Sequence, residues 1–452
     1  MASRGVLPAP GSARALVLGL GRSGEAVARH LLARGADVIV VDDAPDERTR
    51  AAAAALGVRL VEEPVPGDLA VLVVATDVVV PSPGVPAAHP VFGLARAAGV
   101  PVRGEVELAA QWSTQPIVAV TGTNGKTTVT SLIADMLAAS GLRAIAAGNI
   151  GLPLCDAVGA EVEVVVAEVS SFQLAFAESF HPAVAVWLNL ADDHLDWHPD
   201  LASYVAAKAR LWARQEPGDV AVVNADDPVV MAEAAHAPSR LVTFGLSRAA
   251  DFGVADGWLR GPGGPIIESS RLPRSLPHDV ANALAAAAAA LAAGASVDGV
   301  RAALVAFGGL PHRLTLVGYG GGVRWYDDSK ATNPHAAVAA VRGFDSVVLI
   351  AGGRNKGLDL STLAQVADRV RAVVAIGEAA PEVAASFAGI RPVAAAATMA
   401  EAVAAAATVA RSGDAVLLSP GCASFDWYRS YAERGDDFAR AVNALLEAQH
   451  AH

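Results

Sequence analysis

One stretch in the middle of the sequence, AVTGTNGKTTVTSLIADML at residues 119–137, most strongly limits what the chain folds into. Apolar residues at 117–120 predict a buried strand, which leads into a turn of glycine and small polar residues and then into an amphipathic helix starting near Lys126. Gly122 and Gly125 let the backbone turn tightly, so that successive N–H groups point at an anion beside the helix N-terminus. This layout predicts a phosphate-binding loop in an α/β domain.

The residues after this turn favour ATP as the ligand. Lys126 is placed to reach bridging and terminal phosphate oxygens, and the hydroxyl group of Thr127 is placed to bind Mg²⁺. The pattern G-x-x-G-K-T is shorter than the full phosphate-loop motif, so the alternative is a glycine turn that binds nothing. The strand before the turn and the helix after it favour ATP binding.

A second glycine loop lies earlier in the chain, at residues 19–24 (GLGRSG). It matches G-x-G-x-x-G between a strand and a helix, and Asp42 ends the next strand at about the spacing of a ribose-binding acid. A nicotinamide dinucleotide is one candidate ligand. A UDP-linked substrate is another, because any nucleoside diphosphate supplies a pyrophosphate for a helix N-terminus. A tight turn that serves packing alone is the third interpretation.

Alternating strand-like and helical stretches predict an α/β protein of three domains in the 452 residues. The first domain is expected to be Rossmann-like (1–110), the second to carry the ATP loop (111–308), and the third to be a further α/β domain (309–452). Buried strands are predicted at residues 15–20, 37–43, 69–76 and 77–84, then at 117–120, 162–171, 183–190 and 218–227, and finally at 323–329, 346–353, 372–377 and 415–421. The alanine run 285–290 is expected to be closely packed helix.

Composition excludes several classes of protein. A formal net charge of −12 argues against nucleic acid as a partner, because such binding needs a basic face. Cys155 and Cys422 cannot form a disulfide framework or a cysteine-rich zinc site, so reduced, packed thiols are expected. The start of the sequence lacks the apolar core of a signal peptide, and no strongly apolar stretch of about 20 residues appears. We expect a cytoplasmic, monomeric protein without a membrane segment.

Polar residues follow the predicted strands of the second domain. Glu168 ends a buried strand, where a carboxylate is costly unless it meets a cation. The next strand end presents Asp193, His194 and Asp196. Since the carboxyl ends of parallel strands meet at one edge, which here carries the ATP loop, a shared ligand site is favoured. Taken singly, three residues are interpreted as ordinary surface residues without a functional role: Asp196, His198 and Lys208. Lys208 lies one helical turn after Tyr204.

Cations beside hydroxyl groups follow the strands of the third domain. Lysines near hydroxyl groups at strand ends indicate a pocket for a small molecule with carboxylates, whereas a lone lysine there would be solvated. The residues concerned are His312, Arg313, Asp328, Lys330, Thr332, Lys356, Ser424 and Phe425.

Several stretches together resemble the Mur ligases of peptidoglycan synthesis, from Leu18 to about Gly435: VTGTNGKTT, GNIG, EVSSFQL, LNLADDHLDWH, PHR, DDSKATNP, AGGRNKG and SPGCASFD. The ATP loop is shared with sister ligases and with folylpolyglutamate synthase, whereas the pair EVSSFQL and DDSKATN is more selective. The likeness is greatest to the member that uses ATP and Mg²⁺ to add D-glutamate to UDP-N-acetylmuramoyl-L-alanine through an acyl phosphate. By this resemblance the three domains bind the UDP substrate, ATP and the amino acid, in that order.

The resemblance also implies roles for individual residues. The implied UDP-substrate contacts are Gly21, Arg22, Ser23, Asp42, Asp43, Ser82, Gly84, Asn149 and His194. The implied ATP contacts are Gly122, Thr123, Asn124, Gly125, Lys126, Thr127, Thr128, Asn282, Arg313 and Asp328. The implied D-glutamate contacts are Lys330, Thr332, Lys356, Ser424 and Phe425. Thr127 and Glu168 would hold one Mg²⁺; His194 and Lys208, the latter as an N-carboxylated lysine, would serve a second. Lys126, His194 and Lys208 would be the catalytic residues.

Two positions depart from the family pattern, and other functions stay open. The family often has Arg where Trp197 stands and Asn where Asp279 stands, so any role carried by these two positions is in doubt. A nicotinamide-dependent oxidoreductase would leave the second loop and its lysine unexplained. A nucleotide-sensing module is disfavoured by the number of charged strand ends. A sister ligase that adds another amino acid is the remaining alternative.

Overall fold

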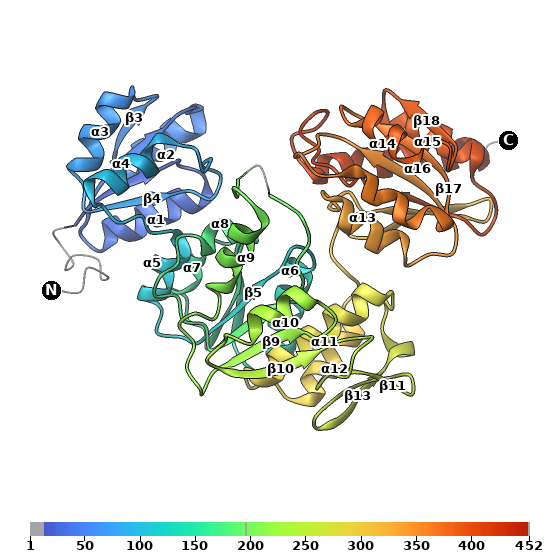
Figure 1. Cartoon of the computed structure of the whole chain (residues 1–452), viewed down its shortest axis with the longest axis horizontal. Helices are drawn as coiled ribbons and strands as arrows, with labels where there is room; N and C mark the ends of the chain where they lie inside the picture. Colours follow the sequence, from blue (N-terminus) through green and yellow to red (C-terminus); the bar gives the residue numbers. More distant parts are fainter. Residues whose placement is uncertain (1–12, 195–196, 451–452) are drawn as a thin grey trace. The chain divides into compact units, whose positions relative to one another are not determined.

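The computed structural model describes residues 13–194 and 197–450. It is an α/β structure in which Asp196 lies outside the described residues. The chain separates into two compact units. The first comprises Met1–Leu190, Trp197–Leu272 and Ala281–Ala306, and the second comprises Ala191–Asp196, Pro273–Val280 and Phe307–His452. Figure 1 shows helices packed around the sheet of each part.

The first sheet of the first unit is parallel and has the order β3 (Arg59–Glu62), β2 (Asp37–Asp42), β1 (Arg14–Leu18), β4 (Val78–Pro81). Its helices are α1 (Arg22–Ala33), α2 (Glu47–Leu56), α3 (Pro66–Val74) and α4 (Pro90–Ala98). The strand predicted at 69–76 is wrong, because these residues lie in and just after α3. Pro66 opens that helix and Asp68 lies in its first turn, both of which favour a helix N-terminus.

The second sheet of this unit has six parallel strands in the order β10 (Arg240–Phe244), β9 (Val220–Asn224), β8 (Val184–Trp187), β5 (Ile117–Thr121), β7 (Val164–Glu168), β6 (Ala144–Gly148). The strands predicted for this domain are confirmed. Helix α6 (Lys126–Ala139) begins at the predicted lysine. The other helices are α5 (Glu105–Trp112), α7 (Leu154–Ala157), α8 (Ser171–Leu174), α9 (Leu201–Ala209), α10 (Pro228–Ala234) and α12 (Val297–Ala306). Helix α11 (Pro277–Ala292) belongs to this unit from Ala281 onward.

Two further features of this unit bear on the predictions. The alanine run 285–290 lies in α11 with no alanine more than 2% exposed, which confirms the packed helix. A small antiparallel sheet, β11 (Gly253–Ala255), β12 (Trp258–Gly261) and β13 (Gly264–Glu268), was not expected from the sequence; it is followed by the short η1 (Ser269–Arg271).

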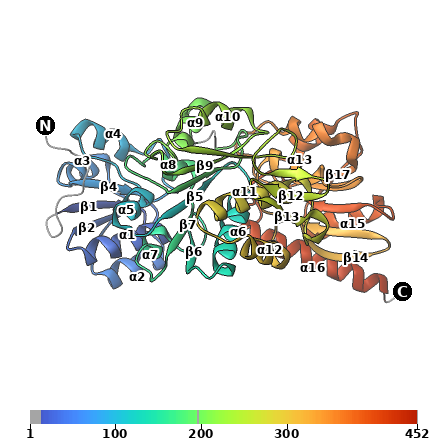
Figure 2. The same cartoon turned by 90° about the horizontal axis from the view of Figure 1, so that it is seen from below.

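The second unit contains a six-stranded sheet in the order β14 (Thr315–Gly320), β15 (Val323–Asp327), β19 (Ala415–Leu418), β16 (Val347–Gly352), β17 (Val370–Ile376), β18 (Val393–Ala396). Only β14 runs antiparallel to its neighbour, and the predicted strands are confirmed. The sheet is accompanied by α13 (Pro334–Val341), η2 (Leu360–Arg369), α14 (Ala380–Phe387), α15 (Met399–Val409) and α16 (Tyr431–His450). Figure 2 gives a second view of these elements.

The compositional predictions are tested in the described part of the chain. Among its helices, none has the length and apolar character needed to cross a membrane. Cys155 and Cys422 are both buried and free, as predicted. Burial raises the pKa of the Cys422 thiol to about 12, so this thiol stays protonated at neutral pH.

Candidate functional site

The predicted ATP loop follows β5, which has β7 and β6 on one side and β8, β9 and β10 on the other. Val120 pairs with Glu168 and Thr121 with Trp187, so three strands end together at this edge. Parallel α/β sheets bind ligands at such a position, outside the carboxyl ends of their strands. The shared edge inferred from the sequence is therefore present for the ATP loop and Glu168.

The loop itself has the features of a phosphate cradle. Gly125 has φ +85°, and a Cβ added there would meet Asn282 Oδ1 at 2.6 Å, so the position requires glycine. The same closeness places the predicted ATP residue Asn282 against the loop. Lys126 Nζ donates to the carbonyl oxygens of Gly122 and Thr123, both at 2.9 Å. The ammonium group is thus held over the loop at the N-terminus of α6.

Asn189, which was not predicted from the sequence, holds the loop in place. Its Oδ1 accepts the backbone N–H groups of Thr123 at 3.1 Å and of Asn124 at 2.8 Å. Its Nδ2 donates to the carbonyl oxygen of Asn124 at 3.1 Å. The available signal was its position two residues after the end of β8, in the stretch LNLADD.

The surroundings of Glu168 suit the binding of a cation. It is 3% exposed, and its Oε1 accepts a hydrogen bond from Asn149 Nδ2 at 3.0 Å. Its Oε2 is buried and has no hydrogen-bond partner within the described residues. A buried carboxylate oxygen is costly without a partner, and Mg²⁺ prefers such oxygen ligands. Thr127, 8% exposed, supplies a hydroxyl group in the first turn of α6.

The chain by itself does not form a complete metal cage. Among residues 13–194 and 197–450, no cluster of three or more His, Cys, Asp or Glu side chains is arranged to hold an ion. Mg²⁺ commonly takes only one or two protein ligands and completes its shell with phosphate oxygens and water. The residues Thr127 and Glu168 fit that pattern.

Lys208 and His198 are buried, so their interpretation as surface residues is wrong. Lys208 is 1% exposed, because α9 turns its side chain toward the ATP loop. Its Nζ lies 2.9 Å from the Gly122 carbonyl oxygen and 4.7 Å from the centre of the Tyr204 ring. His198 is 2% exposed, and its Nε2 lies 2.9 Å from Ser171 Oγ.

The first glycine loop is organised by an acid. A Cβ at Gly24 would overlap the carbonyl oxygen of Gly19, which explains the third glycine of the motif. Asp42 Oδ2 accepts the N–H of Leu20 at 3.1 Å, and Ser82 Oγ donates to the Gly19 carbonyl oxygen at 2.8 Å. The predicted residues Asp42 and Ser82 therefore shape this loop from the ends of β2 and β4, the strands on either side of β1.

The other predicted UDP-substrate residues of the first unit differ in exposure. Gly21, Arg22 and Gly84 are exposed, and Gly21 caps α1. Asp43 Oδ2 lies 2.9 Å from His89 Nε2. Ser23 is half-buried beside Glu105, whose pKa is raised by burial and lowered in part by the Ser23 hydroxyl group.

The predicted amino-acid residues lie in the second unit, after three adjacent strands. Asp327 of β15 pairs with Leu418 of β19, which in turn pairs with Ile350 of β16, so these strands end at one edge. Arg354 and Ala423 exchange two backbone hydrogen bonds of 2.9 and 3.0 Å, which join the loop of Lys356 to the loop of Ser424. The residues of this edge are Asp328, Lys330, Thr332, Lys356, Ser424 and Phe425.

Several polar side chains at this edge already have ion-pair or hydrogen-bond partners. Lys356 Nζ lies 3.1 Å from Asp193 Oδ1, and Asn333 Nδ2 donates to Asp193 Oδ2 at 3.1 Å. The neighbouring His194 has φ +58°, a conformation that is costly for a residue other than glycine. Lys330 Nζ lies 5.0 Å from the centre of the Tyr431 ring.

Asp328 is a buried acid of unusual proton affinity. Burial raises its pKa to about 7, while the hydrogen bond from Ser419 Oγ (2.7 Å) and the charge of Arg313 act in the opposite direction. The carboxyl group therefore sits near its midpoint of titration at neutral pH. This behaviour is frequent at binding and catalytic sites.

Arg434 is a second structurally important residue that was not predicted from the sequence. It is 1% exposed in α16, and its guanidinium group donates to the carbonyl oxygens of Ser329 at 2.8 Å, Cys422 at 3.1 Å and Ala423 at 3.2 Å. Burial lowers the pKa of Arg434 to about 10, which leaves the group charged at neutral pH. Arg434 thus fastens the loop before Lys330 to the loop before Ser424.

The two departures from the family pattern have partners of their own. Trp197 Nε1 donates to the carbonyl oxygen of Val85 at 3.0 Å. Asp279 pairs with Arg274 Nε at 3.2 Å. Both replacements are therefore built into the packing of their units.

Comparison with known proteins gives the same picture along the chain. Residues 13–104 match the N-terminal domain of MurD-like Mur ligases, residues 120–290 the Mur ligase middle domain, and residues 312–422 the glutamate ligase domain of Mur ligases. Proteins named UDP-N-acetylmuramoylalanine--D-glutamate ligase are similar: the one from Frankia casuarinae is 50% identical over 95% of this chain and 93% of its own length. The one from Desulfosudis oleivorans is 44% identical over 97% of this chain and 98% of its own.

Solved structures support the fold. A pseudomurein peptide ligase type C from Methanothermus fervidus is 18% identical, with a TM-score of 0.62 over 96% of this chain and 100% of its own. A UDP-N-acetylmuramate-alanine ligase from Thermotoga maritima is 19% identical, with a TM-score of 0.60 over 96% of this chain and 99% of its own.

Proposed function

This chain belongs to the Mur ligase family, and we propose that it is an ATP-dependent ligase that joins D-glutamate to UDP-N-acetylmuramoyl-L-alanine, with release of ADP and phosphate. The observation that carries the proposal is near full-length identity of 50% to a relative named for this reaction. The ATP loop with Lys126 and the buried Glu168 at the same sheet edge supports the ATP-dependent chemistry.

The proposed reaction has two steps. The alanyl carboxylate forms a bond to the γ-phosphorus of ATP while the bond to ADP breaks, which gives an acyl phosphate. The amine of D-glutamate then attacks the acyl carbon, loses a proton, and releases inorganic phosphate as the amide forms. The first step brings two anions together. Lys126 and the loop N–H groups offset that repulsion at the phosphates.

Bound Mg²⁺ would supply positive charge at the phosphoryl oxygens. In this proposal Thr127 and Glu168 hold one ion, and Asn149 orients the Glu168 carboxylate through its hydrogen bond. Asn282 lies against the ATP loop, and Arg313 and Asp328 of the second unit are proposed as further ATP contacts. His194 is proposed to serve the second ion and the muramoyl end of the substrate.

The UDP group is proposed to bind the first glycine loop. The exposed residues Gly21, Arg22 and Gly84 are free to contact it, and Asp42 and Ser82 keep the loop in shape. This assignment explains two glycine loops in one enzyme, because each of the two nucleotide substrates takes its own.

D-Glutamate is proposed to bind the edge of the second unit. Lys330, Lys356, Thr332 and Ser424 offer charges and hydroxyl groups for two carboxylates. Lys356 already pairs with the carboxylate of Asp193, which supports its use as an anion-binding group.

Phosphate release with UDP-N-acetylmuramoyl-L-alanine and ATP tests the function. We expect turnover with D-glutamate and not with L-glutamate or L-lysine, and a product whose mass and chirality match D-glutamate. Turnover with a different amino acid would assign the chain to a sister activity, and the absence of ATP-dependent phosphate release with all of them would overturn the proposal.

We further propose that Lys208 acts as a carbamate. An ammonium group would repel Mg²⁺, whereas N-carboxylation supplies oxygen ligands and keeps one N–H for the Gly122 carbonyl oxygen. Lys208→Ala should lose most activity, and formate or acetate should restore part of it by occupying the vacated anionic position. Lys208→Arg should be as poor as the alanine variant, and an active arginine variant would refute the carbamate role.

A further inference from the structure

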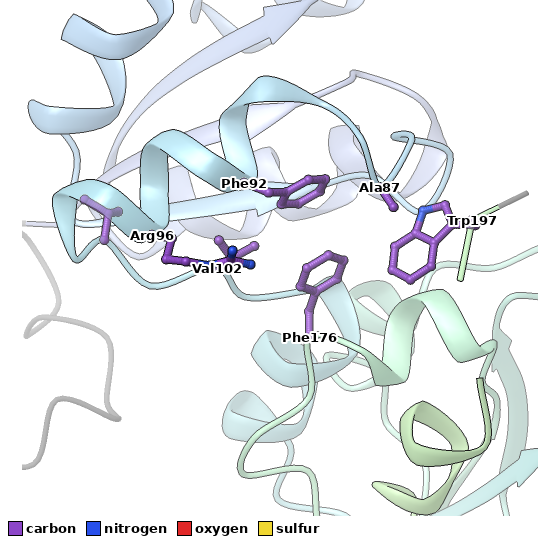
Figure 3. A pocket seen from close by; sticks show the side chains of 7 residues that line it. Ala87, Phe92, Arg96, Val102, Phe176 and Trp197 are labelled. Atoms are coloured by element: carbon purple, nitrogen blue, oxygen red, sulfur yellow. The ribbon is translucent and has the colours of Figure 1, made fainter. Parts of the chain in front are cut away.

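A cavity of about 280 Å³ in the first unit lies outside all the residues assigned above. It opens between α4 with its flanking residues and the segments of the next domain that carry Phe176 and Trp197 (Figure 3). Its lining includes Ala87, Phe92, Arg96, Val102, Phe176 and Trp197. The lining is apolar apart from one charged side chain.

Aromatic rings form the walls of this cavity and are held in fixed positions. The rings of Phe92 and Phe176 stack at 5.3 Å with an angle of 15° between their planes. The Trp197 ring meets the Phe176 ring edge-on, at 6.1 Å and 89°. The hydrogen bond from Trp197 Nε1 to the Val85 carbonyl oxygen fixes the indole. Flat, fixed walls of this kind favour a planar ring as the ligand, by stacking or edge contacts.

Arg96 gives the cavity a charge. It lies in the last turn of α4 and is exposed. Within the part of the chain that the structure describes, its guanidinium group takes part in no hydrogen bond or ion pair, and no acidic side chain lines the cavity. A guanidinium group beside aromatic walls is suited to a carboxylate, which it binds through two parallel hydrogen bonds.

We propose that this cavity binds a small planar aromatic carboxylate, with its ring against Phe92, Phe176 and Trp197 and its carboxylate at Arg96. The volume of about 280 Å³ lies just below the usual range for small-molecule sites, about 300 Å³ and upward, which limits the ligand to one or two fused rings. Neither the two glycine loops nor the strand ends described above contribute to this site.

The site is also next to segments that the proposed function uses. Val85, which accepts the Trp197 hydrogen bond, follows Gly84 of the proposed UDP site. An occupant would contact Ala87, which lies three residues after Gly84, and Trp197, whose indole is hydrogen-bonded to Val85. The link between this cavity and substrate binding rests on the proposed function, whereas the binding of an aromatic carboxylate to the cavity does not.

Ligand-observed NMR titration of the full chain, without ATP or UDP substrate, tests the proposal. The probe is 2-naphthoate, and its uncharged partner is 2-naphthamide. We expect saturable binding of 2-naphthoate with a Kd on the order of 1 mM, as for fragment-sized ligands, and weaker binding of the amide. Equal binding of the two probes, or no saturable binding of 2-naphthoate, would overturn the proposal.

Three variants locate the binding. Ala87→Phe places a ring into the cavity from an exposed position without removing a contact, and it should abolish 2-naphthoate binding. Arg96→Met should weaken 2-naphthoate about three- to five-fold, as expected for an exposed ion pair, and leave the amide unchanged. Arg59→Met is the control, because Arg59 is exposed on β3 and does not line the cavity.

The unfolding temperature of each variant shows whether it is folded. If Ala87→Phe is folded and still binds 2-naphthoate with wild-type affinity, the ligand binds elsewhere and the proposal fails. If Ala87→Phe does not fold, Arg96→Met decides, since an unchanged affinity for 2-naphthoate in that variant also contradicts the proposal. Because no turnover is measured, either result is independent of the ligase assignment.

Discussion

The two glycine loops of the first unit share a layout but differ in what holds them. Both connect a buried strand to a helix whose N-terminus faces the turn. In the loop after β1, the shaping groups are the acid Asp42 and the hydroxyl group of Ser82. In the loop after β5, they are the amide of Asn189 and the ammonium group of Lys126.

In the proposed function, this difference separates a loop that only binds a diphosphate from a loop at which a phosphoryl group is transferred. The first loop offers N–H groups and an exposed arginine, which suit the proposed binding of a diphosphate that does not react. The second adds a lysine inside the cradle and a buried carboxylate beside it, which are needed where charge develops during phosphoryl transfer. A glycine motif alone therefore says where a phosphate sits, and the side chains around it say whether that phosphate reacts.

The largest expected effect comes from the lysine that only the second loop has. Lys126→Ala should lower kcat/KM for ATP by about 10³-fold or more, because a positive charge on the transferring phosphoryl group is lost. The urea midpoint should stay close to wild type, since Lys126 is only partly buried. Steady-state phosphate release measures the effect. A variant that keeps more than a tenth of the activity would show that Lys126 does not give the second loop a catalytic role that the first loop lacks.

The next effect is on stability and belongs to the first loop. Gly24→Ala should lower the free energy of unfolding by about 2–3 kcal/mol, because its Cβ would overlap the Gly19 carbonyl oxygen. Gly21→Ala is the matched control: nothing lies within 4 Å of the added Cβ, and a change below about 1 kcal/mol is expected. Urea unfolding of both variants gives the comparison. Equal losses would show that this loop does not depend on close packing of α1.

A smaller effect should follow from loosening the second loop. Asn189→Ala removes three hydrogen bonds to the backbone of Thr123 and Asn124, and we expect kcat/KM for ATP to fall about 30-fold, or about 2 kcal/mol. The KM for the UDP substrate should not change. Asn189→Asp keeps both acceptor interactions but loses the donor, so its loss should be intermediate. An Asn189→Ala enzyme with unaltered ATP kinetics would assign the loop geometry to other groups.

The smallest effect concerns the exposed charge of the first loop. Arg22→Ala should raise the KM for the UDP substrate about three- to five-fold and leave kcat unchanged, since an exposed ion pair contributes little. Added salt should shrink the difference between variant and wild type. Initial rates at two salt concentrations measure both. A fall in kcat would mean that the first loop takes part in the reaction after all.

The sequence predicted that the ATP loop and Glu168 lie at one sheet edge, because a parallel sheet places the ends of neighbouring strands together whatever the packing behind them. It failed where apolar runs are ambiguous. Residues 69–76 have the composition of a strand, but Pro66 and Asp68 start a helix that leaves Val71 and Val74 exposed. Helix and strand cannot be told apart by periodicity in a run so short.

The misses at the site share a different cause. Asn189 and Arg434 act on backbone atoms that are far away in the sequence, so no motif shows their partners. His198 is buried because Phe172 and Tyr204 pack against its ring, and those contacts depend on how α8 and α9 are placed. The first-unit and second-unit site assignments themselves remain predictions until the variants are measured.

Arg434 has a consequence for the order in which the protein is completed during synthesis. The loops that it joins, around Ser329 and around Cys422 and Ala423, leave the ribosome before it does. Until α16 emerges, the carbonyl oxygens of these loops have no guanidinium group to fasten them. During synthesis this edge of the second unit is therefore fastened only after residue 434 has emerged. A chain released before residue 434 would contain both glycine loops but would lack the hydrogen bonds that join the loop around Ser329 to the loop around Cys422.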